Sequence, residues 1–395
     1  MEKAVIVEAV RTPIGRDRGA LKDFNVDVLA SLVLAEVVKR ADFDPAALDD
    51  VIFGVSNQVA TAKNIARVAL LRAGYPVSIP GTTVTRLCGS GLQAINFAAM
   101  AIETGQAEVV VAGGAESMTR TPFILEKIPS PYARGDRTLI DAFSGTLSAP
   151  DGMHVPNSVT AENVAGRYGV SREDQDRFAY HSHMRAKAAI EEGRFKEEIV
   201  PVEVPAGKKG GDLVLFDTDE HVRYDTTLEK LASLRPAFQE GGTVTAGNCS
   251  GINDGAAAVL MMSADRAEAE GYTPLGRIRG TGVAGTEPDV MGIGPIHSTP
   301  KALRTAGAEM GDIGLVELNE AFASQALACA QVLEIDLDRM NVNGGAIGLG
   351  HPLGCTGARM MTTLLYEMKR RGENLGLVTM CIGGGQGIST VVERT

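Results

Sequence analysis

The chain of 395 residues contains no tryptophan, and aromatic residues make up only 5% of it. It also lacks any apolar run that approaches the roughly 18 residues of a membrane-spanning helix, so no membrane partner is expected. Its first residues lead directly into a strand at 4–9, with no apolar signal region before them. These absences together predict a cytoplasmic protein.

An excess of positive charge is lacking as well. Lys and Arg total 38 against 49 Asp and Glu, which gives a formal net charge of −11. Nucleic acids and membrane surfaces are bound through basic faces, so this charge argues against both as partners. A small anionic ligand would need a local basic patch.

Patterns that would indicate a disulfide framework or a metal centre are also missing. The chain has five cysteines, an odd number, and no two of them form a C-x-x-C pair. We therefore expect reduced thiols. The six histidines show no metal-ligand spacing, so we expect no metal site.

Strand-like and helix-like patterns alternate at both ends of the chain. Short apolar runs predict strands, and apolar residues three and four positions apart predict helices. The predicted strands are 4–9, 51–55, 82–87, 108–112, 314–318 and 377–380. The predicted helices are 28–40, 65–73, 89–103, 300–306, 320–333 and 358–371. This order predicts a layered α/β fold with a largely parallel sheet.

The two ends of the chain match each other. Residues 50–54 match 314–318, and residues 109–114 match 378–383. The spacing from Gly54 to Cys88 equals, within one residue, the spacing from Leu318 to His351. Duplication of a half-domain explains these matches, and the alternative is that any two βαβ segments share such spacing. We favour duplication and interpret residues 119–249 as an inserted loop domain that covers the core.

Cys88 and His351 occupy equivalent loops of the two halves. Cys88 precedes a predicted helix, where unpaired backbone N–H groups and the helix dipole favour a thiolate. Related by a pseudo-twofold axis, the two residues would face each other as a nucleophile and its base. Taken singly, each has a structural interpretation, as a buried cysteine that packs in the core and a loop histidine that caps a turn.

Two further positions follow predicted strands. Cys381 meets a glycine-rich turn, whose backbone N–H groups are suited to an anion. Its thiol could act as an acid or base, or it could pack at the strand end. Asn319 suits a helix N-cap and Glu320 suits the first helical turn. The residues alone leave structural and catalytic interpretations open at these positions.

Four blocks of the sequence together resemble the signature blocks of the thiolase family. They are LCGSG at 87–91, NEAF at 319–322, GHP at 350–352 and CIGGG at 381–385. The resemblance runs from RTPIG at 11–15 to the C-terminus. It implies a duplicated thiolase-type α/β core in five layers, αβαβα, with an inserted loop domain. The implied units are an N-terminal half at 1–118 and 250–270, a CoA-binding lid at 119–249 and a C-terminal half at 271–395.

The resemblance implies a CoA-dependent acyltransferase. A 3-oxoacyl-CoA and CoA would give acyl-CoA and acetyl-CoA, or the reverse Claisen condensation would form acetoacetyl-CoA. Cys88 would carry the acyl group, with His351 taking its proton, and Cys381 would move the proton on carbon. One oxyanion would be held by the backbone N–H groups of Cys88 and Gly383. The other would be held by His351 and a water bound to Asn319.

The same resemblance implies the ligands and partners. Arg223 and Ser250 would contact CoA, which is a substrate rather than a tightly bound cofactor. Acyl-CoA and CoA would be the small-molecule partners, and the chain would form a homodimer or homotetramer. The reaction would belong to fatty acid metabolism.

Three places depart from the family pattern. Pro156-Asn157-Ser158 stand before TAEN at 160–163, where members commonly have Met-Gly, and these positions border the acyl and pantetheine tunnel. Cys249 replaces a usual small residue beside Ser250, and Cys355 stands where alanine is frequent. We favour neutral small-residue replacements for both cysteines, and the alternative is altered reactivity.

Two other functions compete with this interpretation. One is a decarboxylating ketoacyl synthase of a related fold, which pairs its cysteine with two histidines, or with histidine and asparagine, and lacks a second catalytic cysteine. The other is a catalytically inactive carrier or scaffold that retains the fold. The presence of Cys381 and of all four blocks favours the thiolase interpretation over both.

Overall fold

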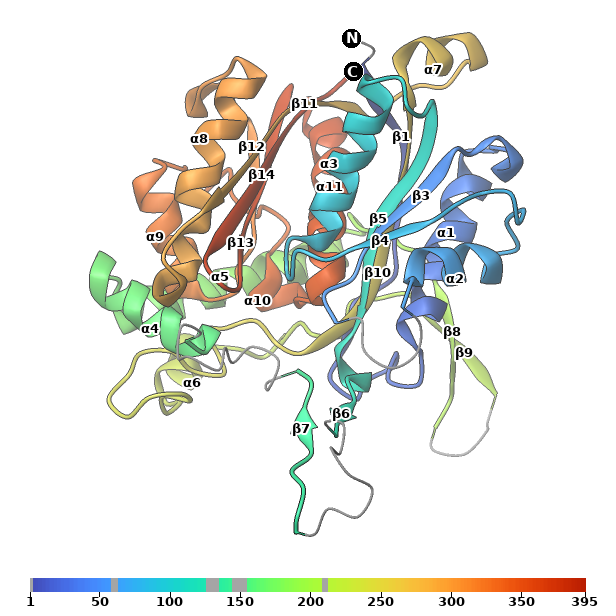
Figure 1. Ribbon diagram of the computed structural model, residues 1–395. Helices are drawn as coiled ribbons and strands as arrows, with labels where there is room; N and C mark the ends of the chain where they lie inside the picture. The colour runs from blue at the N-terminus through green and yellow to red at the C-terminus, as the bar shows by residue number, and fades with distance from the viewer. Residues whose placement is uncertain (1–2, 58–62, 126–134, 144–154, 208–211) are drawn as a thin grey trace.

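The structure is a computed structural model that describes residues 3–57, 63–125, 135–143, 155–207 and 212–395. Its centre is a large mixed sheet with helices on both faces, and the two chain ends lie near each other at one end of the molecule (Figure 1). Within the described residues, no helix is long and apolar enough to cross a membrane.

The N-terminal part of the sheet follows the order β1-β10-β5-β3-β4. Both β1–β10 and β10–β5 are antiparallel pairs, whereas β5–β3 and β3–β4 are parallel. The strands are β1 (Ala4–Arg11), β3 (Asp50–Gly54), β4 (Thr82–Val84), β5 (Val109–Ser117) and β10 (Asn253–Ser263).

The C-terminal part repeats this pattern in the order β11-β14-β13-β12. The first two pairs are again antiparallel and the third is parallel. The strands are β11 (Gly276–Gly285), β12 (Leu315–Leu318), β13 (Leu375–Ile382) and β14 (Gln386–Glu393). This repeat confirms the predicted duplication.

The two parts of the sheet meet where β1 and β11 pair over only two positions, Val5 with Arg277 and Ile6 with Gly276. The prediction of a largely parallel sheet is wrong, because most strand pairs are antiparallel. Sequence reasoning did not find β10, β11 or β14. Every residue of β10 is buried, so its sequence lacks the alternation of a half-exposed strand.

Helices complete five layers, which confirms the predicted αβαβα architecture (Figure 1). Helices α1 and α2 cover the outer face of the N-terminal sheet, and α8 covers the outer face of the C-terminal sheet. Helices α3 and α11 lie between the sheets and contact each other. Their bounds are α1 (Val26–Arg40), α2 (Ile65–Arg72), α3 (Ser90–Glu103), α8 (Gly294–Ala306) and α11 (Leu353–Arg371).

Successive side chains of β5 point to opposite faces of the sheet and pack against the helix layers on both sides. Val109 and Val111 pack with the α1 side chains on one face. Val110 and Ala112 pack with α3 and α11 on the other. A strand buried on both faces reads as a continuous apolar run, which is how β5 was predicted.

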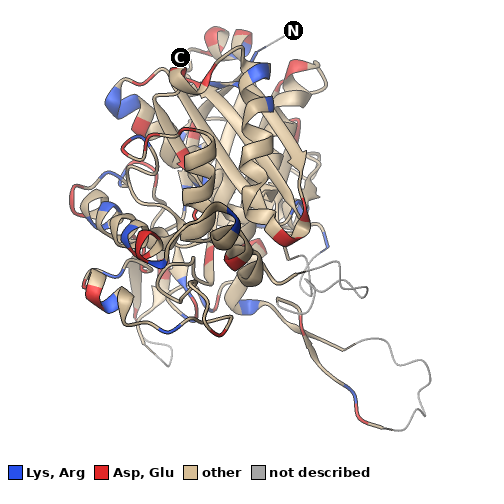
Figure 2. Ribbon diagram, turned by 90° about the vertical axis from the view of Figure 1, so that its left-hand side faces the viewer, with Lys and Arg blue, Asp and Glu red and all other residues tan. Residues whose placement is uncertain are grey.

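The remaining elements lie around the core. Ser171 caps α5 by accepting a 3.1 Å hydrogen bond from the backbone N–H of Asp174. Figure 2 shows that charged residues lie mainly on outer helices and loops. The other strands are β2 (Gly15–Arg16), β6 (Phe123–Ile124), β7 (Ile140–Asp141), β8 (Val202–Pro205) and β9 (Leu213–Phe216). The other helices are α4 (Asn157–Tyr168), α5 (Arg172–Glu191), α6 (Leu228–Ala232), α7 (Ala264–Glu270), α9 (Ala323–Val332) and α10 (Ala346–Leu349).

The three predicted helices of the last third have different starts in the structure. Helix α8 begins at Gly294 rather than at residue 300, since Pro300 lies inside it. Helix α9 begins at Ala323 and α11 at Leu353, whereas residues 320 and 358 were expected. The loop domain expected at 119–249 includes segments 126–134, 144–154 and 208–211, which lie outside the described residues. Its bounds stay a prediction.

Glycines allow the central helices to approach the sheet closely. A Cβ atom on Gly91 of α3 would lie 2.6 Å from the carbonyl oxygen of Gly354 in α11. A Cβ on Gly114 of β5 would collide with the same oxygen. Because the obstacle is backbone rather than a flexible side chain, neither position has room for alanine.

We predict that Gly114→Ala lowers the free energy of unfolding by about 2 kcal/mol or more, because overpacking forces the backbone to move. Gly166→Ala is the matched control. Gly166 lies within helix α4, and nothing lies within 4 Å of its Cβ position, so alanine should stabilise by about 1 kcal/mol. Denaturant unfolding of both variants measures the difference. Equal stability would contradict the close packing of α3, α11 and β5.

Candidate active site

Cys88 lies in a tight turn between β4 and α3, as predicted. Leu87 has a φ of +45°, in the left-handed region. The Ser90 hydroxyl accepts a 2.8 Å hydrogen bond from the backbone N–H of Arg86 and donates a 2.6 Å bond to the carbonyl of Leu87. These bonds fix the turn. They hold the Cys88 thiol in a site where the residue is only 7% exposed.

His351 lies in the equivalent loop, immediately before α11, and its protonation is set by its neighbours. Its backbone N–H donates to Asn253 Oδ1 over 2.9 Å. Its Nδ1 is 2.7 Å from the hydroxyl of Thr356, which itself donates to the carbonyl of Pro352. Since that hydroxyl hydrogen is already used, Nδ1 must carry the proton and donate it. The Nε2 atom therefore keeps its lone pair and can act as a base.

Asn319 lies beside the Nε2 atom of His351. Its Nδ2 lies 3.3 Å from His351 Nε2, and the Asn319 residue is 1% exposed. The Oδ1 atom of Asn319 is buried without a hydrogen-bond partner among the described residues. Burial, with the nearby Arg359 cation, lowers the pKa of His351 to about 3. The imidazole is consequently neutral near pH 7 and able to accept a proton.

Gly383 and Cys88 meet across the two halves. The backbone N–H of Gly383, in the turn between β13 and β14, hydrogen-bonds the Cys88 sulfur. Burial nevertheless raises the pKa of Cys88 to about 11, although this hydrogen bond lowers it. The expectation of a thiolate stabilised by the helix N-terminus is wrong, because removal of the thiolate from water has the larger effect. The resting thiol needs a base.

Cys381 completes the site from the end of β13. It is 1% exposed and packs with Met291 and Ala321. Burial raises its pKa well above the ordinary value, and the nearby Cys88 raises it further. The Cys381 thiol therefore lies near the Cys88 thiol. The structure places Gly383 and Cys381 near Cys88, and Asn319 beside His351.

The two residues expected to bind CoA, Arg223 and Ser250, both lie close to Cys249. Ser250 donates through both its backbone N–H and its hydroxyl to the carbonyl of Ala321, over 3.0 and 3.1 Å. The side chain of Arg223 is exposed, and its Nη2 lies 3.4 Å from the carbonyl of Ala246. Its charge lowers the pKa of Cys249, whereas burial raises that pKa to about 11. Arg223 therefore supplies a local positive charge beside Ser250.

Cys355 belongs to the same core cluster as Cys88 but is more deeply buried. It is fully buried in the cluster formed by α3, α11 and the sheets, and burial raises the pKa of its thiol to about 12. A thiol so shielded is unreactive. This agrees with the interpretation of Cys355 as a small packing residue.

Sequence reasoning missed three residues that position the site. Thr356 and Asn253 orient His351, and Asn253 is 98 positions away from it in the chain. The Glu116 carboxylate accepts hydrogen bonds from the backbone N–H groups of Ser56 and Gly354, over 2.9 and 2.8 Å. Burial raises the pKa of Glu116 to about 7. Only Thr356, five positions after His351, carried a local signal.

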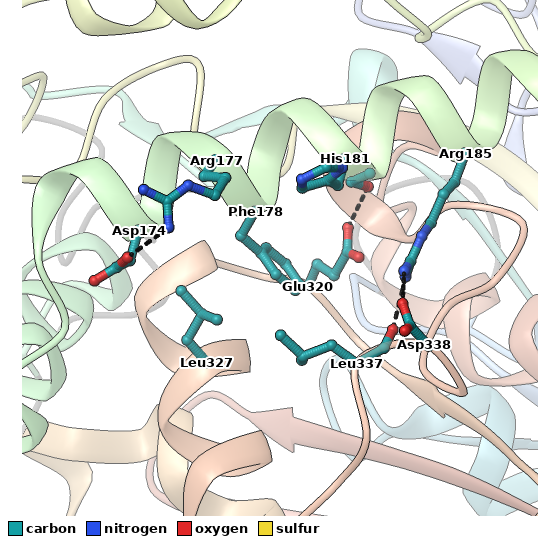
Figure 3. A pocket seen from close by; sticks show the side chains of 10 residues that line it. Asp174, Arg177, Phe178, His181, Arg185, Glu320, Leu327, Leu337 and Asp338 are labelled. Atoms are coloured by element: carbon teal, nitrogen blue, oxygen red, sulfur yellow. Dashed lines mark hydrogen bonds and ion pairs between the residues drawn. The ribbon is translucent and has the colours of Figure 1, made fainter.

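A separate cavity of about 400 Å³ lies between α5 and α9 (Figure 3). Phe178, Leu327 and Leu337 form its apolar wall. Glu320 reaches it from beside Asn319 and accepts a 2.6 Å hydrogen bond from Ser182. Neither the site cysteines nor His351 line this cavity. Glu320 therefore has hydrogen-bond partners of its own, away from the site around Cys88.

The raised pKa of Cys88 predicts how its alkylation depends on pH. Below a pKa of about 11, the thiolate fraction rises about tenfold per pH unit. We expect the rate of Cys88 labelling by iodoacetamide to rise continuously from about pH 6 to 10, as followed by peptide mass spectrometry. A plateau below about pH 9 would show that the thiol is already ionised at rest.

Comparison with known proteins agrees with this geometry. The thiolase N-terminal domain model matches residues 4–265, and the thiolase C-terminal domain model matches residues 272–394. The chain is 48% identical over 397 residues to an acetyl-CoA acetyltransferase of Escherichia coli (strain K12), covering 100% of both chains. It is 46% identical over 401 residues to a 3-ketoacyl-CoA thiolase of Bacillus subtilis (strain 168), again covering 100% of both.

A solved structure shares the whole fold. The acetyl-CoA acetyltransferase of Bacillus anthracis superposes with a TM-score of 0.96 at 44% identity, covering 100% of this chain and 99% of that one. Both domain models and the full-length relatives therefore agree with the fold described above. The chain belongs to the thiolase family of acyltransferases.

Proposed function

We propose that this protein catalyses CoA-dependent acyl transfer through an acyl-Cys88 intermediate. A 3-oxoacyl-CoA and CoA give acyl-CoA and acetyl-CoA, and the reverse condensation forms a carbon–carbon bond. One observation carries this proposal. The Gly383 N–H and a second thiol at Cys381 lie near Cys88, and the neutral His351 precedes the equivalent helix of the other half.

The first step forms the acyl-enzyme. His351 Nε2 takes the proton of the Cys88 thiol, and the sulfur attacks the 3-keto carbon of the substrate. The oxygen of that carbon becomes an oxyanion held by the backbone N–H groups of Cys88 and Gly383. One such donor is typically worth about 10²–10³ in rate. The bond between the second and third carbons then breaks and leaves its electron pair on acetyl-CoA.

The second half of the reaction uses the other thiol. Cys381 gives its proton to the carbanion of acetyl-CoA, whose enolate oxygen is held by His351 and a water bound to Asn319. The unpartnered buried Oδ1 of Asn319 supports the water-binding role, because buried oxygens ordinarily have a partner. CoA then takes the acyl group from Cys88, and its thiol proton restores the resting enzyme. In the condensation direction Cys381 removes the proton from acetyl-CoA.

CoA acts in this scheme as a substrate, with no tightly bound cofactor. A human mitochondrial 3-ketoacyl-CoA thiolase, 41% identical to this chain, has been solved in complex with CoA. We assign Arg223 and Ser250 to CoA contact here. The exposed guanidinium of Arg223 supplies the local positive charge that an anionic ligand needs on a chain of net charge −11.

We also infer that the protein forms a homodimer or homotetramer. We place it in the cytoplasm, with a role in fatty acid metabolism. Among the described strands, β4 pairs only with β3, and apolar side chains of the loop before β4 and of α3 are exposed. Val77 is 79% exposed, Phe97 39% and Met100 44%. An open strand edge with apolar neighbours is suited to a second copy.

A decarboxylating ketoacyl synthase is the alternative enzyme. That reaction has no need of a thiol to move a proton on acetyl-CoA, whereas Cys381 lies beside Cys88. Malonyl-CoA consumption without thiolysis of acetoacetyl-CoA would favour the alternative. Loss of the acetoacetyl-CoA enolate absorbance on addition of CoA would favour the thiolase reaction and exclude an inactive scaffold.

We predict that Cys88→Ala abolishes thiolysis and condensation, because no acyl-enzyme can form. In the unaltered protein, mass spectrometry after acetyl-CoA treatment should show an acetyl adduct on Cys88. Cys355→Ala is the matched control and should retain the adduct, since Cys355 is buried in the core. An adduct on Cys249 or Cys355 would refute the assignment of Cys88.

A second variant separates the two thiols. Cys381→Ala should still become acetylated on Cys88 but should lose deuterium exchange at the methyl group of acetyl-CoA. The loss should be about 10²–10⁴-fold, which is typical of general acid–base catalysis. Exchange at the wild-type rate would make Cys381 a packing residue.

A further inference from the structure

The side-chain amide of Asn253 holds the backbone of His351. Asn253 is the first residue of β10 and is fully buried. Its Oδ1 accepts the 2.9 Å hydrogen bond from the His351 N–H, and its Nδ2 donates to the carbonyl of Gly15 over 3.0 Å. These partners fix the orientation of the amide, because an N–H requires the oxygen and a carbonyl requires the nitrogen. A Cβ atom on Gly350 would lie 2.6 Å from Asn253 Cγ, so the amide also packs against the residue before His351.

His221 supplies a third partner for this amide. Its Nδ1 lies 3.3 Å from Asn253 Nδ2. Because Nδ2 can only donate, Nδ1 of His221 accepts its second hydrogen, and the ring proton is on Nε2. Burial, together with the nearby cations of Arg223 and Arg16, lowers the pKa of His221 to about 4. The ring is therefore neutral near pH 7 and keeps the lone pair that Asn253 needs.

The other edge of the His221 ring is confined by backbone. A Cβ atom on Gly251 would collide with Cε1 of His221 and would lie 3.0 Å from its Nε2. The ring cannot move away from Asn253 on that side without displacing the chain at Gly251. His221 is thus held between Gly251, which follows Ser250, and the amide that holds His351.

Resting on the proposed acyl transfer, we propose that His221 is a positioning residue that aligns the base His351 through Asn253. Its hydrogen bond is to Asn253 and not to His351 itself. Without the Nδ1 acceptor, a buried Nδ2 hydrogen loses its partner, and the amide is free to shift away from the His351 N–H. A small displacement of a base slows the chemical step, because the reacting groups no longer meet in the required geometry.

The test compares three replacements of His221. Asparagine places an amide oxygen at about the position of the imidazole Nδ1 and can still accept from Asn253. Leucine has no acceptor, and glutamine carries its amide further out, at about the position of Nε2. His297→Leu is the matched control, because it makes the same change at an exposed histidine of α8. Mass spectrometry follows single-turnover acetylation of Cys88 over a range of acetyl-CoA concentrations, which gives a maximum rate and a half-saturating concentration.

We expect His221→Leu and His221→Gln to lower the maximum rate by roughly 5- to 50-fold, between the effect of one hydrogen bond and that of a misplaced catalytic group. The half-saturating concentration should stay within about twofold of the wild-type value, since substrate binding is not the step affected. His221→Asn should restore most of the lost rate, and His297→Leu should match the wild type. In an Asn253→Ala background, His221→Leu should have little further effect, because the two residues act through one contact.

The outcomes separate this proposal from the one it rests on. If the Asn, Leu and Gln variants of His221 lower the maximum rate equally, the Nδ1 acceptor does not position His351 and the proposal is wrong. It is equally wrong if His221→Leu and His221→Gln change only the half-saturating concentration, because His221 would then serve binding. If the wild type forms no acetyl adduct on Cys88, acyl transfer itself is refuted.

Discussion

Backbone contact between the two central helices and the sheet is the constraint on which the rest of this structure depends. The carbonyl of Gly354 in α11 faces Gly91 of α3 and Gly114 of β5, and none of these positions has space for a side chain. Because α3 and α11 lie together between the sheets, their N-terminal ends bring Cys88 and His351 from opposite halves of the chain. Glu116 strengthens the link by binding the Gly354 N–H from β5. The contacts that pack these helices against the sheet therefore also position the site residues.

Burial controls the electrostatics of the site more than any single charge. It raises the pKa of Cys88 to about 11 and lowers that of His351 to about 3. Both groups are thereby neutral at rest, as thiol and imidazole. In the proposed mechanism, proton transfer between them would create an ion pair beside the N–H of Gly383 and the amide of Asn319. Fixed donors of this kind are effective because they need no reorientation during the reaction.

The sequence predicted the centre of the molecule better than its connections. The α/β alternation, the duplication and the Cys88 and His351 loops followed from short local patterns, because each strand-to-helix turn carries its own glycines. The antiparallel strands β10, β11 and β14 were missed, since pairing such as Ala4 with Ser263 depends on residues far apart in the chain. The raised pKa of Cys88 was missed for a related reason. A helix terminus is visible in sequence, whereas the surrounding layers that exclude water are not.

The placement of β1 has a consequence for synthesis of the chain. This strand precedes every other strand of the sheet in the chain and pairs along its length with β10, which ends at Ser263. Its other neighbour, β11, begins still later, at Gly276. Both edges of β1 therefore lack a sheet partner until β10 and β11 have been made. Long-range pairing of this kind slows folding and exposes unpaired strand edges to aggregation in the meantime.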